Sequence, residues 1–510
     1  MVAVFEVKKE IPTYMSAIFP NFSLSRAALK TACTVALLTL FLGLVLAVVF
    51  WMPGAMYDDT FFSGPAIQFA RTGQMTSFLF DWDPLQHYTD RPFWYPPIFF
   101  YVFGSWLRLF GCSTASALCF YATLAAVSSA GFSLMLSRFD CPPYWCFASS
   151  IISWTTFYSA TLYGLRPEPL ALAFLFMGLP LIASCRTLLQ CAGFCFSGLA
   201  IFTAPRTGAW VLAFGGLAVI GALSSRHTVR QMLLVSRNAI IGVLGGFLIF
   251  LFSIDFNWSA FSQKFFATLA LKSPSFASGF ELGLHFFVNG FAKLNWLGVL
   301  TLLLSGVIAS VATGPRLAIL PLTLTYLLGI ILALGTGAIG TVIFLYLATL
   351  GIWGIQCSSS SLAIARRLII IACALFAFIP LIINAAAFYE SRFNEPDKWT
   401  HYRKIAAEVE SRSWREVWID HFSLRYVFDF KPPSSARAAT LHLRELAENP
   451  VPQDNQTSYV LSRSVLFEAA PGKFTDQPGM KIMGRTFLIR SGPEIVLITK
   501  EYTMPPSPSR

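Results

Sequence analysis

Long apolar segments recur along the chain from residue 31 to residue 388, and they constrain the fold more than any other feature. A run of about 20 apolar residues has the length that crosses the hydrocarbon core of a bilayer as a helix. The composition agrees, because 55% of the 510 residues are hydrophobic and 12% are charged, whereas soluble domains carry roughly 25% charged residues. The sequence therefore predicts a polytopic α-helical membrane protein.

Eleven segments are expected to span the membrane, and the chain after them has a different character. The expected spans are 31–52, 114–136, 144–163, 169–184, 190–204, 207–224, 236–254, 291–312, 317–335, 339–356 and 367–388. From residue 391 on, charged residues become frequent and the apolar runs shorten. We therefore predict two domains, a transmembrane domain over 1–390 and a small soluble α/β domain over 391–510.

Within the predicted soluble domain, two kinds of stretch alternate. The segments 399–412 and 434–449 have helical periodicity, whereas 459–468, 485–491 and 494–502 are β-branched or alternating. This alternation is the reason for expecting a mixed α/β unit.

The segment 95–111, "YPPIFFYVFGSWLRLFG", decides the predicted topology. The basic leader, with Lys8 and Lys9, places the N-terminus in the cytoplasm. If 95–111 spanned the bilayer, the basic loops around Arg230 and Arg366 would face outward, against the positive-inside rule. Its shortness and its Trp and Tyr residues also favour a helix that lies in the membrane interface.

With an interfacial helix at 95–111, four parts of the chain share the outer side: the first loop 53–113, the turn 163–170, the stretch 255–290 and the C-terminal domain. The candidate functional residues of this side are the acids Asp58, Asp59 and Glu168, the bases Arg91, Arg166 and Arg206, and Lys264, Lys272 and His285. Acidic and basic side chains are therefore expected to converge outside the membrane.

Asp58 and Asp59, in "GAMYDDTFFSG", lie just after the first predicted span. A carboxylate at the hydrocarbon boundary loses hydration, and two neighbouring carboxylates raise each other's pKa, which suits one of them to act as a general base. The alternative is an aspartate that only caps a helix over 60–72. Both readings stay open, since there are two aspartates.

The basic residues and Glu168 also have two interpretations. Arg166 and Glu168, in "GLRPEPL", form either a structural ion pair or an anion-binding base beside an assisting acid. Arg91, Arg206 and the lysines of 255–290 match phosphate oxygens, because guanidinium binds them bidentately. A single arginine of this kind can instead be an interfacial anchor whose charged end reaches the headgroups.

Several function classes are disfavoured. The net charge of +11 is explained by Lys and Arg of cytoplasmic loops, so nucleic-acid binding is not expected. The ten cysteines are too scattered for a zinc site. No Gly-rich phosphate loop, HExxH or GxSxG motif occurs. The segment "DWD" at 81–83 is interpreted as a loop or a helix cap, with metal binding as the weaker alternative, because the α/β nucleotide-binding domain that this motif needs is absent from the sequence pattern. No metal site is therefore predicted.

The order of three segments resembles a known family. These are "YDDTFFSGPAIQFARTGQM", "YPPIFFYVFGSWLRLFG" and "LYGLRPEPLALAFLF". Together they are similar to the membrane-embedded GT-C glycosyltransferases, and above all to the family-39 group of aminoarabinose transferases and protein O-mannosyltransferases. The resemblance covers roughly residues 30–210. It implies a GT-C-like fold with juxtamembrane helices and an extracytoplasmic C-terminal domain.

Residue roles follow from the resemblance. It makes Asp58 the base or acceptor-orienting carboxylate, with Asp59 in place of the family's glutamate and Glu168 as the later acid. The donor phosphate is then expected to bind Arg91, Arg166 and Arg206. Tyr95 stands where the family often has a lysine before the double proline, and Arg91 is the expected substitute. Tyr57, His87 and Tyr95 are expected to line the substrate cavity.

The resemblance implies transfer of a sugar from a polyprenyl-phosphate donor, with inversion, to a hydroxyl of a lipid, glycan or protein acceptor. No cofactor is required in this reading, and a divalent metal is an alternative that no motif indicates. The expected location is a bacterial inner membrane with the C-terminal domain in the periplasm. The competing hypothesis is a transporter or flippase of a lipid-linked or anionic substrate, since buried charges and many spans suit it equally.

Overall fold

The computed structural model describes residues 26–49, 58–76, 79, 91–137, 165–182, 184, 186–205, 229–272, 396–439, 455–462 and 495–498. Most of this part of the chain is helical. Its helices before residue 273 are α1 (Arg26–Val49), α2 (Asp58–Thr72), α3 (Ile98–Phe110), α4 (Thr114–Ser137), α6 (Glu168–Ile182), α7 (Thr187–Thr203), α9 (Val229–Ser253) and α10 (Trp258–Lys272).

Three of the described helices are long and apolar enough to cross a membrane. They contain the segments Arg26–Val45, Thr114–Met135 and Leu233–Ser253. The helices α6 and α7 are also apolar but have 15 and 17 residues. A mostly helical chain with such segments is compatible with a membrane protein.

The predicted helices at 31–52, 114–136, 169–184, 190–204 and 236–254 are confirmed as α1, α4, α6, α7 and α9. The helix expected within 95–111 is confirmed as α3. The remaining predicted spans, at 144–163, 207–224, 291–312, 317–335, 339–356 and 367–388, lie outside the described residues. The total of eleven spans therefore stays a prediction.

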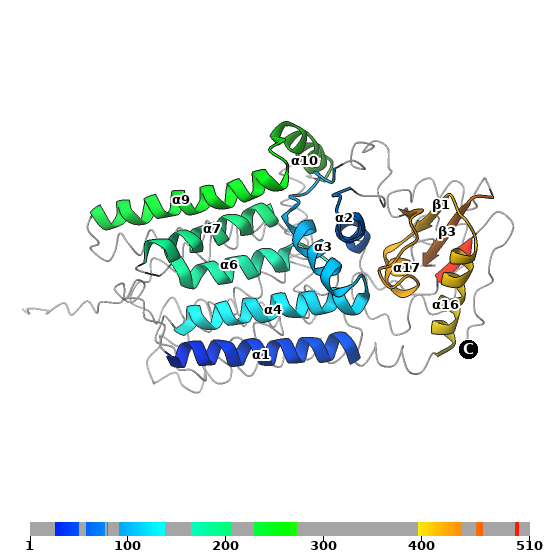
Figure 1. Ribbon diagram of the computed structural model, residues 1–510, viewed down its shortest axis with the longest axis horizontal. Coiled ribbons are helices and arrows are strands. Elements are labelled where there is room, and N and C mark those ends of the chain that lie inside the picture. Colours follow the sequence, from blue (N-terminus) through cyan, green and yellow to red (C-terminus); the bar gives the residue numbers. More distant parts are fainter. Residues whose placement is uncertain are drawn as a thin grey trace, which may run out of the picture.

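The long helices lie side by side in a row, which Figure 1 shows in the order α1, α4, α6, α7, α9. Glycines allow two of the close approaches. A Cβ added to Gly131 of α4 would lie 2.3 Å from the carbonyl oxygen of Phe176 in α6, and one added to Gly242 of α9 would lie 2.3 Å from that of Cys191 in α7. Any larger residue there would push the helix backbones apart.

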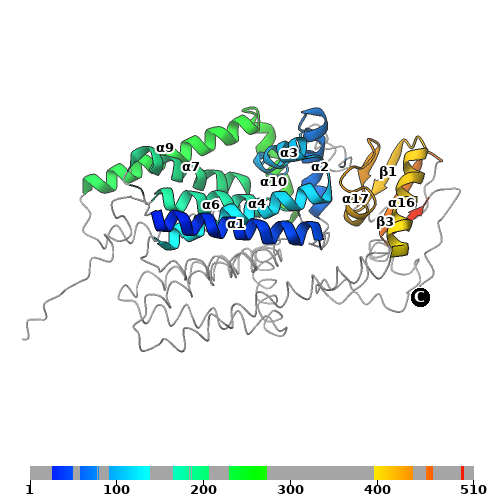
Figure 2. The same ribbon diagram turned by 60° about the horizontal axis from the view of Figure 1, so that its bottom comes forward.

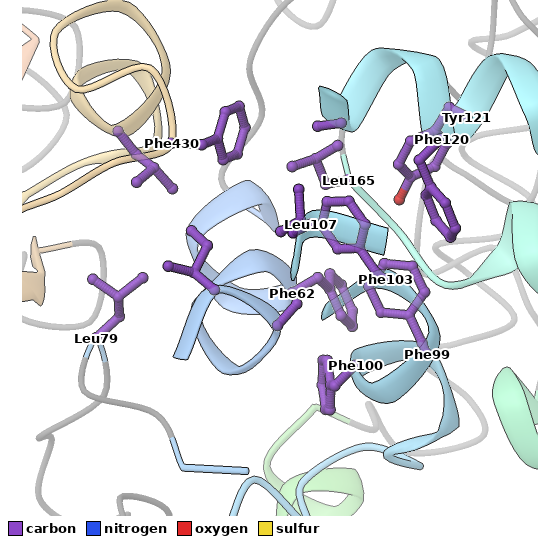
Figure 3. Close-up of a cluster of buried hydrophobic side chains, with 14 of the residues drawn as sticks. Phe62, Leu79, Phe99, Phe100, Phe103, Leu107, Phe120, Tyr121, Leu165 and Phe430 are labelled. Atoms are coloured by element: carbon purple, nitrogen blue, oxygen red, sulfur yellow. The ribbon is translucent and has the colours of Figure 1, made fainter. Parts of the chain in front are cut away.

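Three shorter helices lie at one end of this row, the end at which α1 has its C-terminus (Figures 1 and 2). We call it the α2/α3 end, and α10 belongs to it. Helix α2 crosses α3 closely, because a Cβ on Gly104 would lie 2.8 Å from the carbonyl oxygen of Ala66. Stacked rings continue the core into α4, with Phe103 5.5 Å from Phe99 and 5.0 Å from Phe120 (Figure 3).

The described residues after 395 contain the helices α16 (Pro396–Ser411) and α17 (His421–Tyr426) and a four-stranded sheet. Its strands are β1 (Glu416–Ile419), β2 (Ala436–Ala438), β3 (Thr457–Ser462) and β4 (Ile495–Ile498), in the order β2-β1-β3-β4. Strand β1 pairs in parallel with β2 and with β3, and β4 runs antiparallel to β3. The helix expected over 399–412 and the strands expected at 459–468 and 494–502 are confirmed in part by α16, β3 and β4.

One prediction in this region is wrong. A helix was expected over 434–449, but Ala436–Ala438 form the edge strand β2. The small side chains of Ala436 and Ala438 are buried beside β1. This tertiary pairing outweighs the helix propensity of alanine. Residues 440–449 lie outside the described residues.

The sheet and its helices pack on the α2/α3 end (Figure 1). Two hydrogen bonds join them directly. The N–H of Ala438 donates to the carbonyl of Leu79 over 2.7 Å, and the N–H of Thr114, which begins α4, donates to Oδ1 of Asp429 over 2.8 Å. The sheet therefore lies against the segments that carry the candidate functional residues.

Candidate functional site

The best-defined part of the candidate site is the ion pair between Arg166 and Glu168. The guanidinium donates from Nε to Oε2 over 3.2 Å and from Nη2 to Oε1 over 3.1 Å. The two side chains are 13% and 7% exposed. Glu168 is the first residue of α6, where its charge also interacts favourably with the helix dipole. A paired carboxylate in this position is held in one orientation.

Tyr121 of α4 holds the backbone that carries this pair. Its hydroxyl donates to the carbonyl oxygen of Arg166 over 2.7 Å, and its side chain is 1% exposed. Figure 3 shows Tyr121 beside Phe120 and Leu165, where α4 approaches the segment before α6. Since α4 and α6 are packed against each other, the turn at 165–168 is held from two sides.

The same turn reaches α2 through an aromatic contact. The guanidinium carbon of Arg166 lies 5.9 Å from the ring centre of Phe62, a distance at which a cation and a ring attract. The ring of Tyr95 also packs edge-to-face against Phe62, with 5.3 Å between the two ring centres. Phe62 follows Asp58 by four residues, so both positions lie on one face of α2. The Arg166–Glu168 pair is thus close to the first turn of α2.

Asp58 and Asp59 are the first two residues of α2. The helix therefore begins two residues before the expected start at 60, and both aspartates are within its first turn rather than ahead of it. Negative charge in the first turn of a helix is stabilised by the dipole. Their positions are compatible with a helix-stabilising role and with chemistry, and the roles predicted for them stay predictions.

Arg91 lies in a second basic group, together with Lys264 of α10. Arg91 forms an ion pair with Asp255, in the turn between α9 and α10. The guanidinium carbon of Arg91 and the Nζ of Lys264 each lie 5.9 Å from the ring centre of Phe93, and Lys264 Nζ donates to the carbonyl of Arg91 over 3.5 Å. Two residues predicted to bind phosphate are therefore neighbours. The pair with Asp255 reduces the charge that Arg91 offers to a ligand.

The electrostatics around Arg91 extend to α3. Burial raises the pKa of the Tyr101 hydroxyl, and the positive charge of Arg91 acts in the opposite direction. Trp94 follows Phe93 in the sequence, and its ring centre lies 5.3 Å from that of Phe62. Phe93 and Phe62 belong to different buried clusters, so Arg91 and Arg166 each contact an aromatic ring of a separate cluster.

Asp255 and helix α10 were missed by sequence reasoning. The stretch 255–290 was expected to lie on the outer side, with no secondary structure assigned to it, and Trp258–Lys272 form a helix. The signal for Asp255 was weak, namely one carboxylate directly after an apolar run. The backbone of Asp255 is left-handed, with φ of 50°, and so is that of Phe256, with φ of 56°. These two residues lie in the turn between α9 and α10.

Three predicted site residues, Tyr57, His87 and Arg206, lie outside the described residues. Within the described ranges, no group of three or more His, Cys, Asp and Glu side chains could hold a metal ion.

An apolar cavity of about 480 Å³ lies among α1, α4 and α6. Its described lining residues include Leu40, Val127 and Met177, and the one polar residue among them is Thr123. The hydroxyl of Thr123 donates within its own helix to the carbonyl of Cys119 over 2.9 Å. The cavity therefore offers an apolar surface to a ligand.

Comparisons of the chain with protein-family models, with curated proteins and with solved structures found no match.

Proposed function

We propose that the chain is a glycosyltransferase that moves a sugar from a polyprenyl-phosphate donor to an acceptor hydroxyl on the outer face of a membrane. The observation that carries the proposal is the approach of the Arg166–Glu168 pair to α2, one helical turn from Asp58, through the ring of Phe62. In this proposal the carboxylate of Asp58 is the base for the acceptor, and the guanidinium of Arg166 supplies positive charge for a phosphate leaving group.

In the proposed reaction, the carboxylate of Asp58 accepts the proton of the acceptor hydroxyl. The hydroxyl oxygen then forms a bond to the anomeric carbon of the sugar, from the side opposite the phosphate. The bond between that carbon and the phosphate oxygen breaks, and the lipid phosphate leaves with the electron pair. Arginine charge stabilises the oxygen anion that develops, and the sugar is transferred with inversion.

Two further features support a lipid-linked donor. The cavity among α1, α4 and α6 is apolar and measures about 480 Å³, which suits isoprene units. The charged groups of Arg91 and Lys264 both contact the ring of Phe93 at the α2/α3 end. A donor phosphate at the level of the headgroups would bind to them there. The donor thus has an apolar region for its tail and two basic groups for its phosphate.

The test is transfer of radiolabel in membranes that contain the full-length chain, with polyprenyl-phosphate mannose and polyprenyl-phosphate aminoarabinose as donors. Label is followed into lipid, glycan and protein fractions. We expect Asp58→Asn to lower transfer by about 100-fold to 10,000-fold, the usual effect of removing a general base. Asp81→Asn, in the same first loop but outside the predicted machinery, is the matched control and should transfer normally.

Full activity of Asp58→Asn would remove Asp58 from the mechanism. Movement of either donor between leaflets of a proteoliposome, without transfer in any fraction, would instead favour the transporter hypothesis.

A further inference from the structure

Three basic side chains at the α2/α3 end have no role in the site described above. Arg71 is in the last turn of α2, Arg108 is in the last turn of α3, and Lys431 follows α17. All three residues are exposed. We call them the basic cluster.

A glycine brings Arg71 and Arg108 close to each other. Nη1 of Arg108 lies 3.6 Å from the point that a Cβ on Gly73 would occupy, and Gly73 is two residues after Arg71. The φ of Gly73 is +75°, a conformation that L side chains rarely adopt. The chain therefore turns at the end of α2 directly beneath the guanidinium of Arg108.

Lys431 is brought to the same place by the hydrogen bond between Asp429 and the start of α4. Asp429 Oδ1 accepts from the N–H of Thr114 over 2.8 Å, so residues 429–431 lie beside residues 112–114. The thiol of Cys112 lies close enough to Arg71 and Lys431 for both charges to affect its pKa. Burial raises its pKa, and the charges of Arg71 and Lys431 act in the opposite direction.

The acidic residues that the structure describes do not balance the positive charge of the basic cluster. Among the residues that the structure describes, no carboxylate forms an ion pair with Arg71, Arg108 or Lys431. The segments 60–80 and 91–139 contain no Asp or Glu at all. Asp429 is two residues before Lys431 in the sequence, and its Oδ1 accepts from the N–H of Thr114 at the start of α4. The described residues of the cluster therefore carry a net positive charge.

Exposed apolar side chains lie next to this charge. Leu109 and Phe110, which directly follow Arg108, are 78% and 62% exposed. The candidate membrane-spanning segment of α4 begins at Thr114, six residues after Arg108. The cluster is therefore at the depth where a spanning helix meets the headgroups, with apolar side chains beside it, as in surfaces that bind anionic membranes.

We propose that Arg71, Arg108 and Lys431 form a binding site for the phosphate headgroup of an anionic membrane lipid, while Leu109 and Phe110 insert among its acyl chains. The two guanidinium groups match phosphate oxygens bidentately, and Lys431 adds a point charge. The site is distinct from the Arg166–Glu168 and Arg91–Lys264 groups. It does not depend on the proposed transferase activity.

The test is lipid retention by the full-length chain, measured by native mass spectrometry after exchange into nanodiscs of phosphatidylcholine with or without phosphatidylglycerol. Each cation near an anionic surface changes lipid affinity about fivefold. We expect Arg71→Gln/Arg108→Gln to bind phosphatidylglycerol roughly 25-fold more weakly than the unmodified chain. Lys431→Gln should weaken it about fivefold.

The matched control is Arg403→Gln/Lys404→Gln, which removes two exposed charges from α16 and should retain phosphatidylglycerol fully. Arg108→Lys keeps the charge and should retain most of the binding, which separates loss of charge from misfolding. Equal retention by Arg71→Gln/Arg108→Gln and the unmodified chain would overturn the proposal, as would an equal loss in the α16 control. Displacement of the lipid by inorganic phosphate at similar concentration would overturn the assignment to a lipid and indicate a free-phosphate site.

Discussion

Glu168→Gln and Arg166→Gln each remove one half of a buried ion pair, and the geometry of the pair predicts how much free energy of unfolding each substitution removes. The side chains are 7% and 13% exposed and are joined by two hydrogen bonds of 3.1 and 3.2 Å. Opposite charges about 4 Å apart attract by about 4 kcal/mol at an effective dielectric constant of about 20. Breaking a buried pair costs about 3–5 kcal/mol, because one charge is left uncompensated. Since glutamine can still accept one hydrogen bond, we expect a loss of about 2–3 kcal/mol for Glu168→Gln.

The measurement is a double-mutant cycle on the free energy of unfolding of the full-length chain, followed by tryptophan fluorescence during SDS titration in mixed micelles. The double variant Arg166→Gln/Glu168→Gln has no buried charge left at this position. It should therefore lose about 2 kcal/mol less than the sum of the two single variants. Additivity of the two single losses within about 0.5 kcal/mol would refute the claim that these residues are energetically coupled.

The same three variants separate a structural pair from a chemical one. If Glu168 takes part in transfer, the double variant is more stable than the sum of the two single losses predicts but transfers no sugar in the radiolabel assay. If the double variant does transfer sugar, Arg166 and Glu168 only hold the turn before α6, and the role predicted for Glu168 is wrong.

Three further predictions concern contacts between elements. Tyr121→Phe removes the hydrogen bond to the turn before α6 and should lower the free energy of unfolding by about 1–2 kcal/mol. An unchanged free energy of unfolding would mean that this hydrogen bond does not stabilise the turn. Asp429→Gly keeps the positive φ of 47° but loses the acceptor for the N–H of Thr114, so it should lower the free energy of unfolding by about 1 kcal/mol. Asp429→Asn keeps an acceptor oxygen and should have nearly the stability of the unmodified chain. Equal stability of the two variants would contradict the capping role. Burial raises the pKa of the Cys112 thiol, and the charge of Arg71 lowers it. Iodoacetamide should therefore alkylate Cys112 faster as the pH increases, and Arg71→Gln should slow the reaction because it raises the thiol pKa further. Peptide mass spectrometry measures the rate of alkylation, and faster alkylation in Arg71→Gln would contradict the prediction.

The helices of the row could be predicted because their signal is local. Each is an apolar segment whose length matches a bilayer, and α1, α4 and α9 agree with the prediction to within a turn or two. The shortness of 95–111 and its Trp and Tyr residues similarly indicated α3. Helix α10 was not anticipated because its polar residues, in "WSAFSQKFFATLALK", interrupt the apolar pattern by which the spans were predicted. Strand β2 was misread because pairing with β1, and not local propensity, determines its conformation.

For the candidate site, the sequence indicated the residues but few of their partners. The Arg166–Glu168 pair could be anticipated, since two residues separated by a rigid proline cannot lie far apart. The pair of Arg91 with Asp255, the approach of Arg166 to Phe62 and the capping of α4 by Asp429 could not, because these partners are 104 to 315 positions apart along the chain. Contacts of that kind depend on how helices cross and turn.

By itself, the sequence determined that the chain is an apolar, largely helical protein with carboxylates and arginines in its first loop and in the turn before α6. Those properties depend on residue type and spacing over less than about 20 positions, the range over which periodicity and hydropathy act. The tertiary structure decided which distant groups meet: the pair of Arg91 with Asp255, the cluster of Arg71, Arg108 and Lys431, and the contact of the sheet with the α2/α3 end. The physical reason is that an ion pair or a phosphate site requires atoms within a few ångströms, and only packing brings distant segments to that separation.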